Sequence, residues 1–368
     1  MSGMIHLTLA LALAALGADE PASLRAKFGP NFVVGVALGG RVPDDYSEAE
    51  HRLILEQFGG VTAENSMKMR AIQPREGVFR FDEADALVDF AERNGLQVHG
   101  HTLLWAKDDT TPRWFFRDGD GPASRELVLS RLETHVKTVV ARYRGRIASW
   151  DVVNEALDDS GPYLRPSGWT TIVGPDFIAR AFEWAREADP DARLVYNDYG
   201  VESPRKREAL LRLVRELRER KAPIDAVGIQ GHWEVDRVPF RDIEALIDAL
   251  DAEGLPTIVS ELDLGVVPSA PWWGADPSRR AEIARKDALA DGCPPELLER
   301  QAEQYARLFS LFVDRSASID RVTFWNLHDG RSWLNYFPWR RTEHPLLFDR
   351  DAEPKHAFRA VMGVEVDQ

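Results

Sequence analysis

The sequence predicts a single (β/α)8 TIM barrel, and the order of its hydrophobic patterns supports this fold class. Short apolar or β-branched runs alternate with longer stretches of helical periodicity along most of the chain. Such alternation predicts parallel strands connected by helices. A doubly wound open sheet is the main alternative, but no G-x-G-x-x-G motif follows the first predicted strand. The closed barrel is therefore preferred.

The predicted strands are short runs without polar alternation, as expected of strands buried on both faces of a parallel sheet. In chain order they are Phe32–Ala37, Gly60–Ala63, Gln97–Thr102, Ala148–Val153, Arg193–Asn197, Ala226–Gln230, Pro256–Ser260 and Arg321–Trp325. Eight strands, each followed by a helical stretch, are the number that a (β/α)8 barrel requires.

The stretches between the strands have apolar residues at the i, i+3, i+4, i+7 spacing of an amphipathic helix. Three clear cases are Ala84, Leu87, Val88 and Ala91; Leu210, Leu213, Val214 and Leu217; and Tyr305, Leu308, Phe309 and Phe312. Residues 203–221 are rich in Arg and Lys, but they share a helix with an apolar stripe. We interpret them as the solvated face of a barrel helix and not as a nucleic-acid site.

One segment departs from the alternation. Val267–Pro295 follows the seventh strand and is long, with an Ala-Pro-Trp-Trp-Gly sequence near its start. It predicts an extended loop above the barrel, where loops vary freely. Trp272 and Trp273 either pack this loop onto the barrel or extend a binding cleft, and the sequence leaves both interpretations open.

Composition excludes several classes of function. The 368 residues include 60 acidic and 46 basic side chains, a formal charge of −14 that argues against a nucleic-acid partner. The single cysteine, Cys293, cannot form an internal disulfide. The histidines show no H-E-x-x-H or similar ligand spacing. We therefore expect no metal and no cofactor.

The N-terminus resembles a secretory signal. An apolar run, Leu7–Leu16, precedes the small residues Gly17 and Ala18, and it is too short to span a membrane. No Lys or Arg precedes the run, so a frayed N-terminal helix is the alternative. The predicted organisation is a signal over residues 1–18 and a barrel domain over 19–368, in a secreted or periplasmic monomer.

Polar and aromatic side chains gather where the predicted strands end, and in a barrel these ends form the active face. Carboxylates and amides bind sugar hydroxyls, aromatic rings cover the apolar faces of pyranose rings, and cleavage of a glycosidic bond requires two carboxyl groups. Glu155 and Glu261 end strands four and seven, on opposite walls of the barrel. The other residues at these ends are Glu64, Asn65, Lys68, His101, Trp105, Asn154, Asn197, Tyr199, Gln230, His232, Asp263, Trp325 and Trp333.

The same segments carry a resemblance to a known family. The chain resembles glycoside hydrolase family 10, the endo-β-1,4-xylanases, from about Phe32 to Phe358. The motifs that carry the resemblance are Thr62–Lys68 (TAENSMK), Gly100–Trp105 (GHTLLW), Trp150–Glu155 (WDVVNE), Tyr196–Tyr199 (YNDY), Gly228–His232 (GIQGH), Glu261–Asp263 (ELD) and Ser332–Trp333 (SW). The resemblance implies a barrel and hydrolysis of β-1,4-xylosidic bonds within xylan or xylo-oligosaccharides. It also implies retention of anomeric configuration through a covalent glycosyl-enzyme intermediate.

The resemblance also implies roles for individual residues. Glu155 matches the acid/base and Glu261 the nucleophile. Asn154 matches the amide that binds the sugar 2-hydroxyl, while His232 and Asp263 match residues beside the nucleophile. Tyr199 matches a residue near the reducing-side subsite. The residues that match the pocket for sugars on the non-reducing side are Glu64, Asn65, Lys68, His101, Trp105, Gln230, Trp325 and Trp333.

Two departures from the family pattern lie near the predicted site. Ala106 stands where the family usually has a histidine, and the loop from Trp105 to Trp114 is longer by about two residues. Gly200 replaces an asparagine that often follows the Asn-Asp-Tyr sequence. We expect these changes to alter the cleavage pattern or the tolerance for decorated xylan. A retaining hydrolase of another β-glycan and a catalytically weak carbohydrate-binding barrel are the alternatives.

Overall fold

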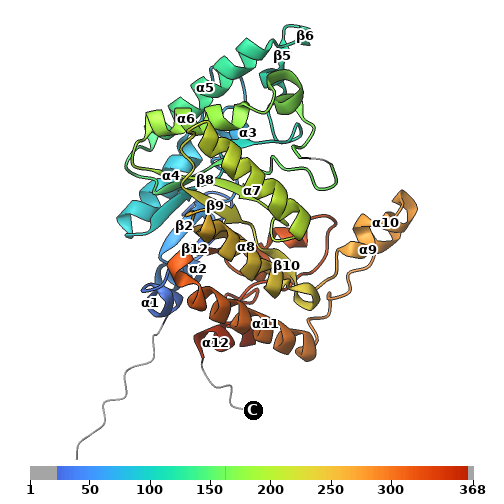
Figure 1. Ribbon diagram of the computed structural model, residues 1–368. Helices are drawn as coiled ribbons and strands as arrows, with labels where there is room; N and C mark the ends of the chain where they lie inside the picture. The colour runs from blue at the N-terminus through green and yellow to red at the C-terminus, as the bar shows by residue number, and fades with distance from the viewer. Residues whose placement is uncertain (1–22, 162, 364–368) are drawn as a thin grey trace, which may run out of the picture.

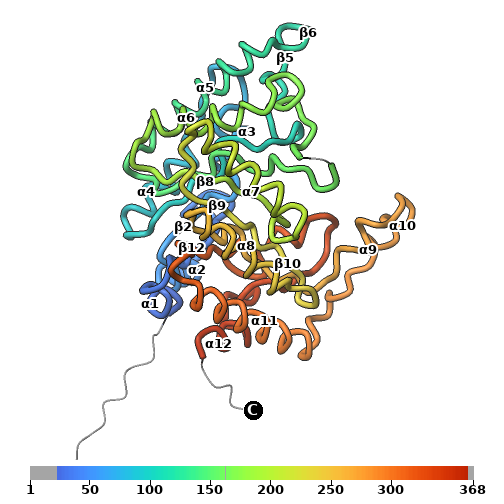
Figure 2. Tube along the Cα trace, in the orientation of Figure 1, coloured from blue at the N-terminus to red at the C-terminus, as the bar shows by residue number. Residues whose placement is uncertain are grey.

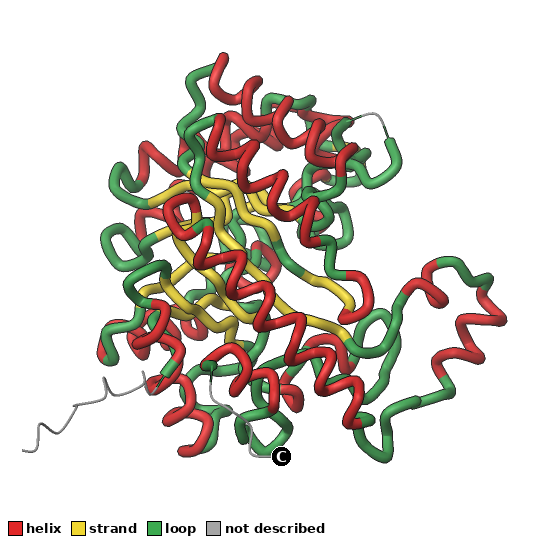
Figure 3. Tube along the Cα trace, turned by 60° about the horizontal axis from the view of Figure 1, so that its bottom comes forward, coloured by secondary structure: helices red, strands yellow, loops and turns green. Residues whose placement is uncertain are grey.

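The computed structural model describes residues 23–161 and 163–363, so the predicted signal over residues 1–18 lies outside the described residues. Within the described part, eight parallel strands close into a barrel and helices surround it (Figures 1 and 3). The fold class predicted from the sequence is confirmed.

The barrel closes because β12 pairs in parallel with both β1 and β11. Around the barrel each of the remaining strands pairs with the next in chain order. The strands are β1 (Val33–Leu38), β2 (Gly60–Ala63), β3 (Gln97–Gly100), β7 (Ser149–Asn154), β8 (Arg193–Asp198), β9 (Ala226–Ile229), β11 (Thr257–Gly265) and β12 (Ile319–Phe324).

A helix follows each barrel strand and covers its outer face, and the helix after the last strand is short. These helices are α2 (Glu48–Gln57), α4 (Asp82–Arg93), α5 (Arg125–Arg142), α6 (Phe177–Ala188), α7 (Pro204–Glu219), α8 (Phe240–Ala252), α11 (Pro295–Asp314) and α12 (His356–Met362). The three apolar stripes predicted from periodicity are buried in α4, α7 and α11. Burial of these apolar side chains against the strands stabilises the fold.

Strand seven differs from its predicted bounds, Pro256–Ser260, because it gains an extra partner. β11 continues to Gly265, where β10 (His232–Glu234) pairs with it from His232↔Asp263 to Glu234↔Gly265. Strand three is shorter than predicted and ends at Gly100, and the chain then adds β4 (Leu104–Trp105) beside β7. Both changes occur at the carboxyl ends of the strands.

The predicted extension after strand seven is also confirmed. It carries α9 (Ala270–Trp273) and α10 (Pro277–Ala284), which project from the body of the molecule (Figure 1). A smaller projection is the antiparallel hairpin of β5 (Arg117–Asp118) and β6 (Gly121–Pro122). Because such segments bury little apolar surface, they shape the rim of the barrel more than its stability.

The two ends of the described chain meet below the barrel (Figure 2). The short helix α1 (Leu24–Phe28) precedes β1, and the Nζ of Lys27 donates to the carbonyl of Val361 at 2.9 Å. A further short helix, α3 (Met69–Ile72), follows β2. Among the described residues no helix is long and apolar enough to cross a membrane.

Candidate active site

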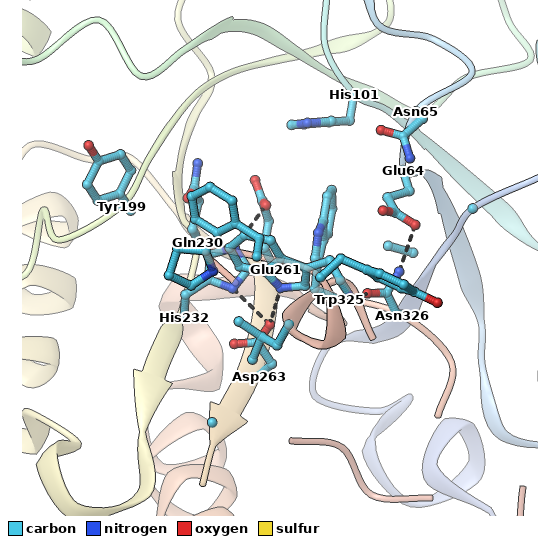
Figure 4. Close-up of a pocket in the computed structure, with 18 of the residues that line it drawn as sticks. Glu64, Asn65, His101, Tyr199, Gln230, His232, Glu261, Asp263, Trp325 and Asn326 are labelled. Atoms are coloured by element: carbon cyan, nitrogen blue, oxygen red, sulfur yellow. Dashed lines mark hydrogen bonds and ion pairs between the residues drawn. The ribbon is translucent and has the colours of Figure 1, made fainter. Parts of the chain in front are cut away.

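A large cavity of about 1200 Å³ lies at the carboxyl ends of the barrel strands. All the site residues that were assigned a role from the sequence line it, and Figure 4 labels ten of the lining residues. The predicted residues in the lining are Glu64, Asn65, Lys68, His101, Trp105, Asn154, Glu155, Tyr199, Gln230, His232, Glu261, Asp263, Trp325 and Trp333.

Glu155 follows β7 directly and is 5% exposed. Its backbone has φ 57°, a left-handed conformation that is rare for a residue other than glycine. Such strain is often found at functional positions, where the surrounding structure holds it. Here the Glu155 N–H donates to the carbonyl of Asn197 at 2.9 Å, so strand β8 fixes the turn.

Two side chains from other elements reach the Glu155 carboxylate. Gln230, just past β9, donates to Oε1 at 3.0 Å, and the Lys107 ammonium forms an ion pair with Oε2. Burial raises the pKa of the Glu155 carboxyl, but Lys107 and Gln230 lower it more, so the net pKa lies below its ordinary value. The unliganded site therefore favours the ionised form of Glu155.

Glu261 lies within β11 and is also 5% exposed. Asn197 donates to its Oε1 at 2.8 Å, and the Nε2 of His232 lies 3.1 Å from its Oε2. Both carboxylate oxygens therefore have a partner from a neighbouring strand. This arrangement fixes the orientation of the carboxylate toward the cavity.

His232 bridges two carboxylates, since its Nδ1 lies 3.0 Å from Oδ2 of Asp263. Burial lowers the pKa of His232, but Asp263 and Glu261 outweigh burial and raise it to about 10. The imidazole is thus protonated near neutral pH and donates to both carboxylates. Trp333 Nε1 also donates to Asp263 at 2.8 Å. Figure 4 shows His232, Glu261 and Asp263 of this cluster.

A chain of amides connects the two carboxylates. Asn197 Nδ2 donates to Oδ1 of Asn154 at 2.9 Å as well as to Glu261. Gln230 Nε2 reaches the same Asn154 oxygen at 3.3 Å as well as Glu155. Glu155 and Glu261 are therefore held by one hydrogen-bond network, and a shift of either would break bonds at the other.

At one end of the cavity, polar residues just past β2 face the loop after β12. Asn326 Nδ2 donates to Glu64 at 2.8 Å, and Lys68 donates to Asn65 at 2.9 Å. Glu64 has room because residue 39 is glycine: a Cβ there would lie 2.3 Å from the Glu64 carboxylate. Figure 4 shows Glu64, Asn65 and Asn326 together on this side.

Aromatic and imidazole rings form the wall between this end and the carboxylates. The His101 ring packs edge-on against Trp325 at 5.2 Å, and its Nδ1 lies 2.8 Å from Asp151. The Lys68 ammonium lies 5.0 Å from the Trp105 ring. Flat apolar rings beside hydrogen-bonding groups suit the two kinds of surface that a sugar presents.

Tyr199 lies at the opposite end of the cavity, apart from the carboxylate cluster (Figure 4). Its hydroxyl donates to Asp159 at 2.5 Å and accepts from Arg165 at 2.9 Å. The cavity therefore extends on both sides of Glu155 and Glu261. A site of this shape accommodates a chain and not only its terminal unit.

Some lining residues lie outside the set predicted from the sequence. Lys107 and Asn326 line the cavity and touch residues of that set. Asn197, noted at a strand end without a role, is fully buried and bonds to Glu261. The position of Lys107 two residues after the GHTLLW motif, in a lengthened loop, was the available indication. Asn326 follows Trp325 where glycine is common in the family, which indicated a side chain close to the sugar pocket but not its contact with Glu64.

The two tryptophans of the extension have different environments. Trp272 stacks on Trp339 with ring centroids 5.1 Å apart, so it packs the extension onto the loop after β12. Trp273 is 53% exposed, lines the cavity and faces the Phe337 ring at 5.8 Å. Of the two interpretations left open by the sequence, packing of the extension therefore applies to Trp272 and lining of the cleft to Trp273.

Nothing in the described residues suggests a metal centre, since no cluster of three or more His, Cys, Asp or Glu there could hold an ion. Two buried carboxyl groups can by themselves supply the acid, base and nucleophile for cleavage of a glycosidic bond. The barrel and its cleft thus define a glycoside hydrolase as the class of protein.

Comparisons with known proteins identify the family. The model for glycosyl hydrolase family 10 matches residues 23–364. The chain is 38% identical over 347 residues to endo-1,4-beta-xylanase B of Paenibacillus barcinonensis, covering 94% of this chain and 98% of the relative. It is 39% identical to an endo-1,4-beta-xylanase of Geobacillus stearothermophilus, covering 93% and 98%.

Solved structures agree with this assignment. The solved structure of a mutant protein in complex with xylotriose is 36% identical and superposes with a TM-score of 0.85, covering 93% of this chain and 99% of the other. The chain belongs to glycosyl hydrolase family 10.

Proposed function

We propose that the chain is an endo-acting β-1,4-xylanase that hydrolyses internal bonds of xylan with retention of anomeric configuration. The observation that carries the proposal is the pairing of buried Glu155 and Glu261 in a cleft that extends on both sides of them. The xylanase relatives and the neighbour that binds xylotriose favour xylan among the β-glycans.

In the first half-reaction, Glu155 gives its proton to the glycosidic oxygen while Glu261 attacks the anomeric carbon. The bond between that carbon and the oxygen breaks, and an ester to Glu261 forms. The reducing-side product leaves with the proton. His232, protonated and held by Asp263, keeps the Glu261 carboxylate oriented for attack.

In the second half-reaction, ionised Glu155 takes a proton from water, and the resulting hydroxide attacks the same carbon. The ester bond breaks and Glu261 is regenerated, so the two inversions give net retention. The proton gained by Glu155 replaces the one lost in the first step. One pair of carboxyl groups therefore completes the cycle without a cofactor.

The remaining cleft residues bind the chain on either side. Asn154 is placed beside Glu155 and Glu261 to hold the 2-hydroxyl of the reacting sugar, a contact expected to strengthen in the transition state. On the non-reducing side we assign sugar binding to Glu64, Asn65, Lys68, His101, Trp105, Gln230, Trp325 and Trp333. Tyr199 is assigned to the reducing side.

The test is proton NMR of freshly mixed protein and xylohexaose. Early β-anomer that later mutarotates is the expected result, because retention releases the β-product first. Glu261→Ala should lose at least about 10⁴-fold in kcat, since no nucleophile remains to form the ester. A matched panel with a β-glucan distinguishes the substrates.

Early α-anomer would contradict retention, and preferential cleavage of the β-glucan would assign another substrate. Wild-type protein that binds xylohexaose but leaves it intact would show a carbohydrate-binding barrel instead. Each of these results replaces a different part of the proposal.

We further propose that the chain is exported and that the mature protein is a monomer. The apolar run Leu7–Leu16 followed by small residues supports export. N-terminal sequencing of the mature protein, expected to begin near Asp19, and light scattering of the purified protein test the two statements.

A further inference from the structure

Lys107 makes a direct ion pair with the Glu155 carboxylate. The lysine side chain is 27% exposed and the glutamate side chain 6%, so the pair is partly shielded from solvent. In partly buried surroundings an ion pair favours the charged form of a carboxyl group more than it does at an open surface. Lys107 therefore acts on the group proposed as acid/base.

The position of Lys107 is fixed by its surroundings. Its ammonium lies 5.4 Å from the ring centroids of both Trp105 and Tyr199, between two aromatic walls of the cleft. Its carbonyl accepts from the hydroxyls of Thr110 at 2.9 Å and Thr111 at 3.0 Å. The lengthened loop thus presents the ammonium to Glu155 instead of leaving it in solvent.

Asp108 ties the same loop to the segment between β7 and α6. Its Oδ1 accepts from the Gly168 N–H at 2.7 Å. At the root of the loop, the buried Ala106 donates its N–H to the carbonyl of Asn154 at 2.9 Å. The small side chain at position 106 leaves the following lysine as the group that fills this part of the cleft.

Other charges face Glu155 from the elements around it, but each has its own partner. Glu261 is bound by His232. Asp198 accepts from Lys206 at 2.9 Å. Of the remaining cations, Lys68 is bonded to Asn65.

Arg165 contacts the backbone of Glu155 and not the Glu155 carboxylate, since it donates to the Glu155 carbonyl at 3.2 Å. In the described part of the chain, Lys107 is thus the cation that reaches the Glu155 carboxylate itself. The other charges act on Glu155 from a greater distance.

We propose, on the basis of the function assigned above, that Lys107 is a positioning residue that holds Glu155 as the ionised base and sets the alkaline limit of the first half-reaction. The two half-reactions need opposite states of Glu155. Protonation of the leaving oxygen needs the acid, whereas activation of water needs the carboxylate. The ion pair with Lys107 favours the second state.

The consequence is a defined pH dependence. The alkaline limb of kcat/KM reports the protonated acid in the free enzyme. Because the ammonium lowers the pKa of Glu155, its removal raises that pKa and moves the alkaline limb upward. The enzyme without Lys107 should therefore remain active at a higher pH than the wild type.

The experiment compares wild type, Lys107→Met and Lys107→Arg on xylohexaose from acid to alkaline pH. Methionine keeps much of the apolar stem and removes the charge. We expect the alkaline limb to move upward by about one pH unit in Lys107→Met and to stay in place in Lys107→Arg. Lys137→Met removes an ion-paired lysine from the outer surface of α5 and serves as the control.

An aryl xylobioside with a good leaving group provides a second readout. Its first half-reaction needs no proton from Glu155, so its alkaline limb should be the same in wild type and Lys107→Met. NMR titration of carbon-13-labelled glutamate in the unliganded protein measures the Glu155 pKa directly, even for a variant with weak turnover.

An unchanged alkaline limb and an unchanged Glu155 titration in Lys107→Met would overturn the inference. So would a uniform loss of rate at every pH that arginine does not restore, because that pattern indicates a purely structural role. Wild-type protein that fails to cleave xylohexaose would instead overturn the proposed function, and the two failures are therefore distinguishable.

Discussion

On the floor of the cleft, Asn154, Glu155 and Glu261 stand at the ends of barrel strands and expose 1%, 5% and 5% of their surface. At the rim, Trp273 ends the short helix α9 and Phe337 stands on a loop, and they expose 53% and 47%. The floor side chains are held by hydrogen bonds from neighbouring strands, whereas the rim side chains make ring contacts, Trp273 with Phe337 and Phe337 with Trp333. The floor is built to hold reacting groups in place, and the rim offers surface for contact.

This difference predicts how each region responds to substitution. A change at the floor should reduce the rate with every substrate, because it alters groups that meet the reacting bond. A change at the rim should matter only for substrates long enough to reach it. The following three substitutions test this contrast.

The largest effect among them is expected at Glu155. Glu155→Gln keeps the size of the side chain but cannot give or take the proton, so kcat/KM on xylohexaose should fall by about 10²- to 10⁴-fold. Initial rates of reducing-end release measure the loss. Glu303→Gln, an exposed change on α11, is the matched control. A loss of less than tenfold would mean that Glu155 is not the acid.

An intermediate effect is expected at His232, because this residue contacts Glu261 and is not assigned a contact with the glycosidic oxygen of the leaving group. His232→Gln removes a charge-assisted hydrogen bond worth about 1.5–3 kcal/mol, which corresponds to roughly 10- to 150-fold in kcat. The loss should appear in kcat more than in KM. If KM rose by as large a factor as kcat fell, His232 would instead belong to the residues that only bind sugar.

The same residue links the floor to stability. The folded pKa of His232 is about 10 and its ordinary value is 6.5, so its contribution to stability is complete below about pH 6.5 and is lost as pH rises toward 10. Wild type should therefore lose more thermal stability than His232→Gln between pH 6.5 and 10. Parallel melting curves for the two proteins in this window would contradict the raised pKa.

The contrast between floor and rim also explains what the sequence could predict. In a barrel, parallel strands place whatever follows them on one face, so the sequence alone could assign motifs such as WDVVNE and ELD to a common site. All the residues given a role in this way do line the cavity. Strand bounds differ by a few residues where β10 lengthens β11 and where β4 replaces the end of strand three.

Loops follow no such rule, and the sequence could not predict their contacts. The direction of the Lys107 side chain depends on Thr110, Thr111 and the rings on either side of the ammonium. Trp272 and Trp273 are adjacent in the chain, yet the first stacks within the molecule and the second faces the cleft. Such differences arise from packing between loops, which periodicity does not encode.

The smallest effect is expected at Trp273, and it is the sharpest test of the rim. Phe337 stacks on Trp333 with centroids 5.3 Å apart, and Trp273 faces Phe337, so aromatic rings continue from the floor to the projecting extension. One aromatic contact is worth on the order of 1 kcal/mol. Trp273→Ala should therefore raise KM about fivefold for long xylo-oligosaccharides. kcat should not change, because the reacting groups are untouched.

A short substrate is the internal control for that substitution. An aryl xylobioside occupies the sites nearest Glu155 and Glu261, and its KM should be the same in wild type and Trp273→Ala. If KM rose equally for both substrates, the substitution would also have altered the sites at the floor, and the two regions would not be independent. If KM rose for neither, the exposed rings of the extension would lie beyond the path of the chain, and binding would be confined to the strand ends.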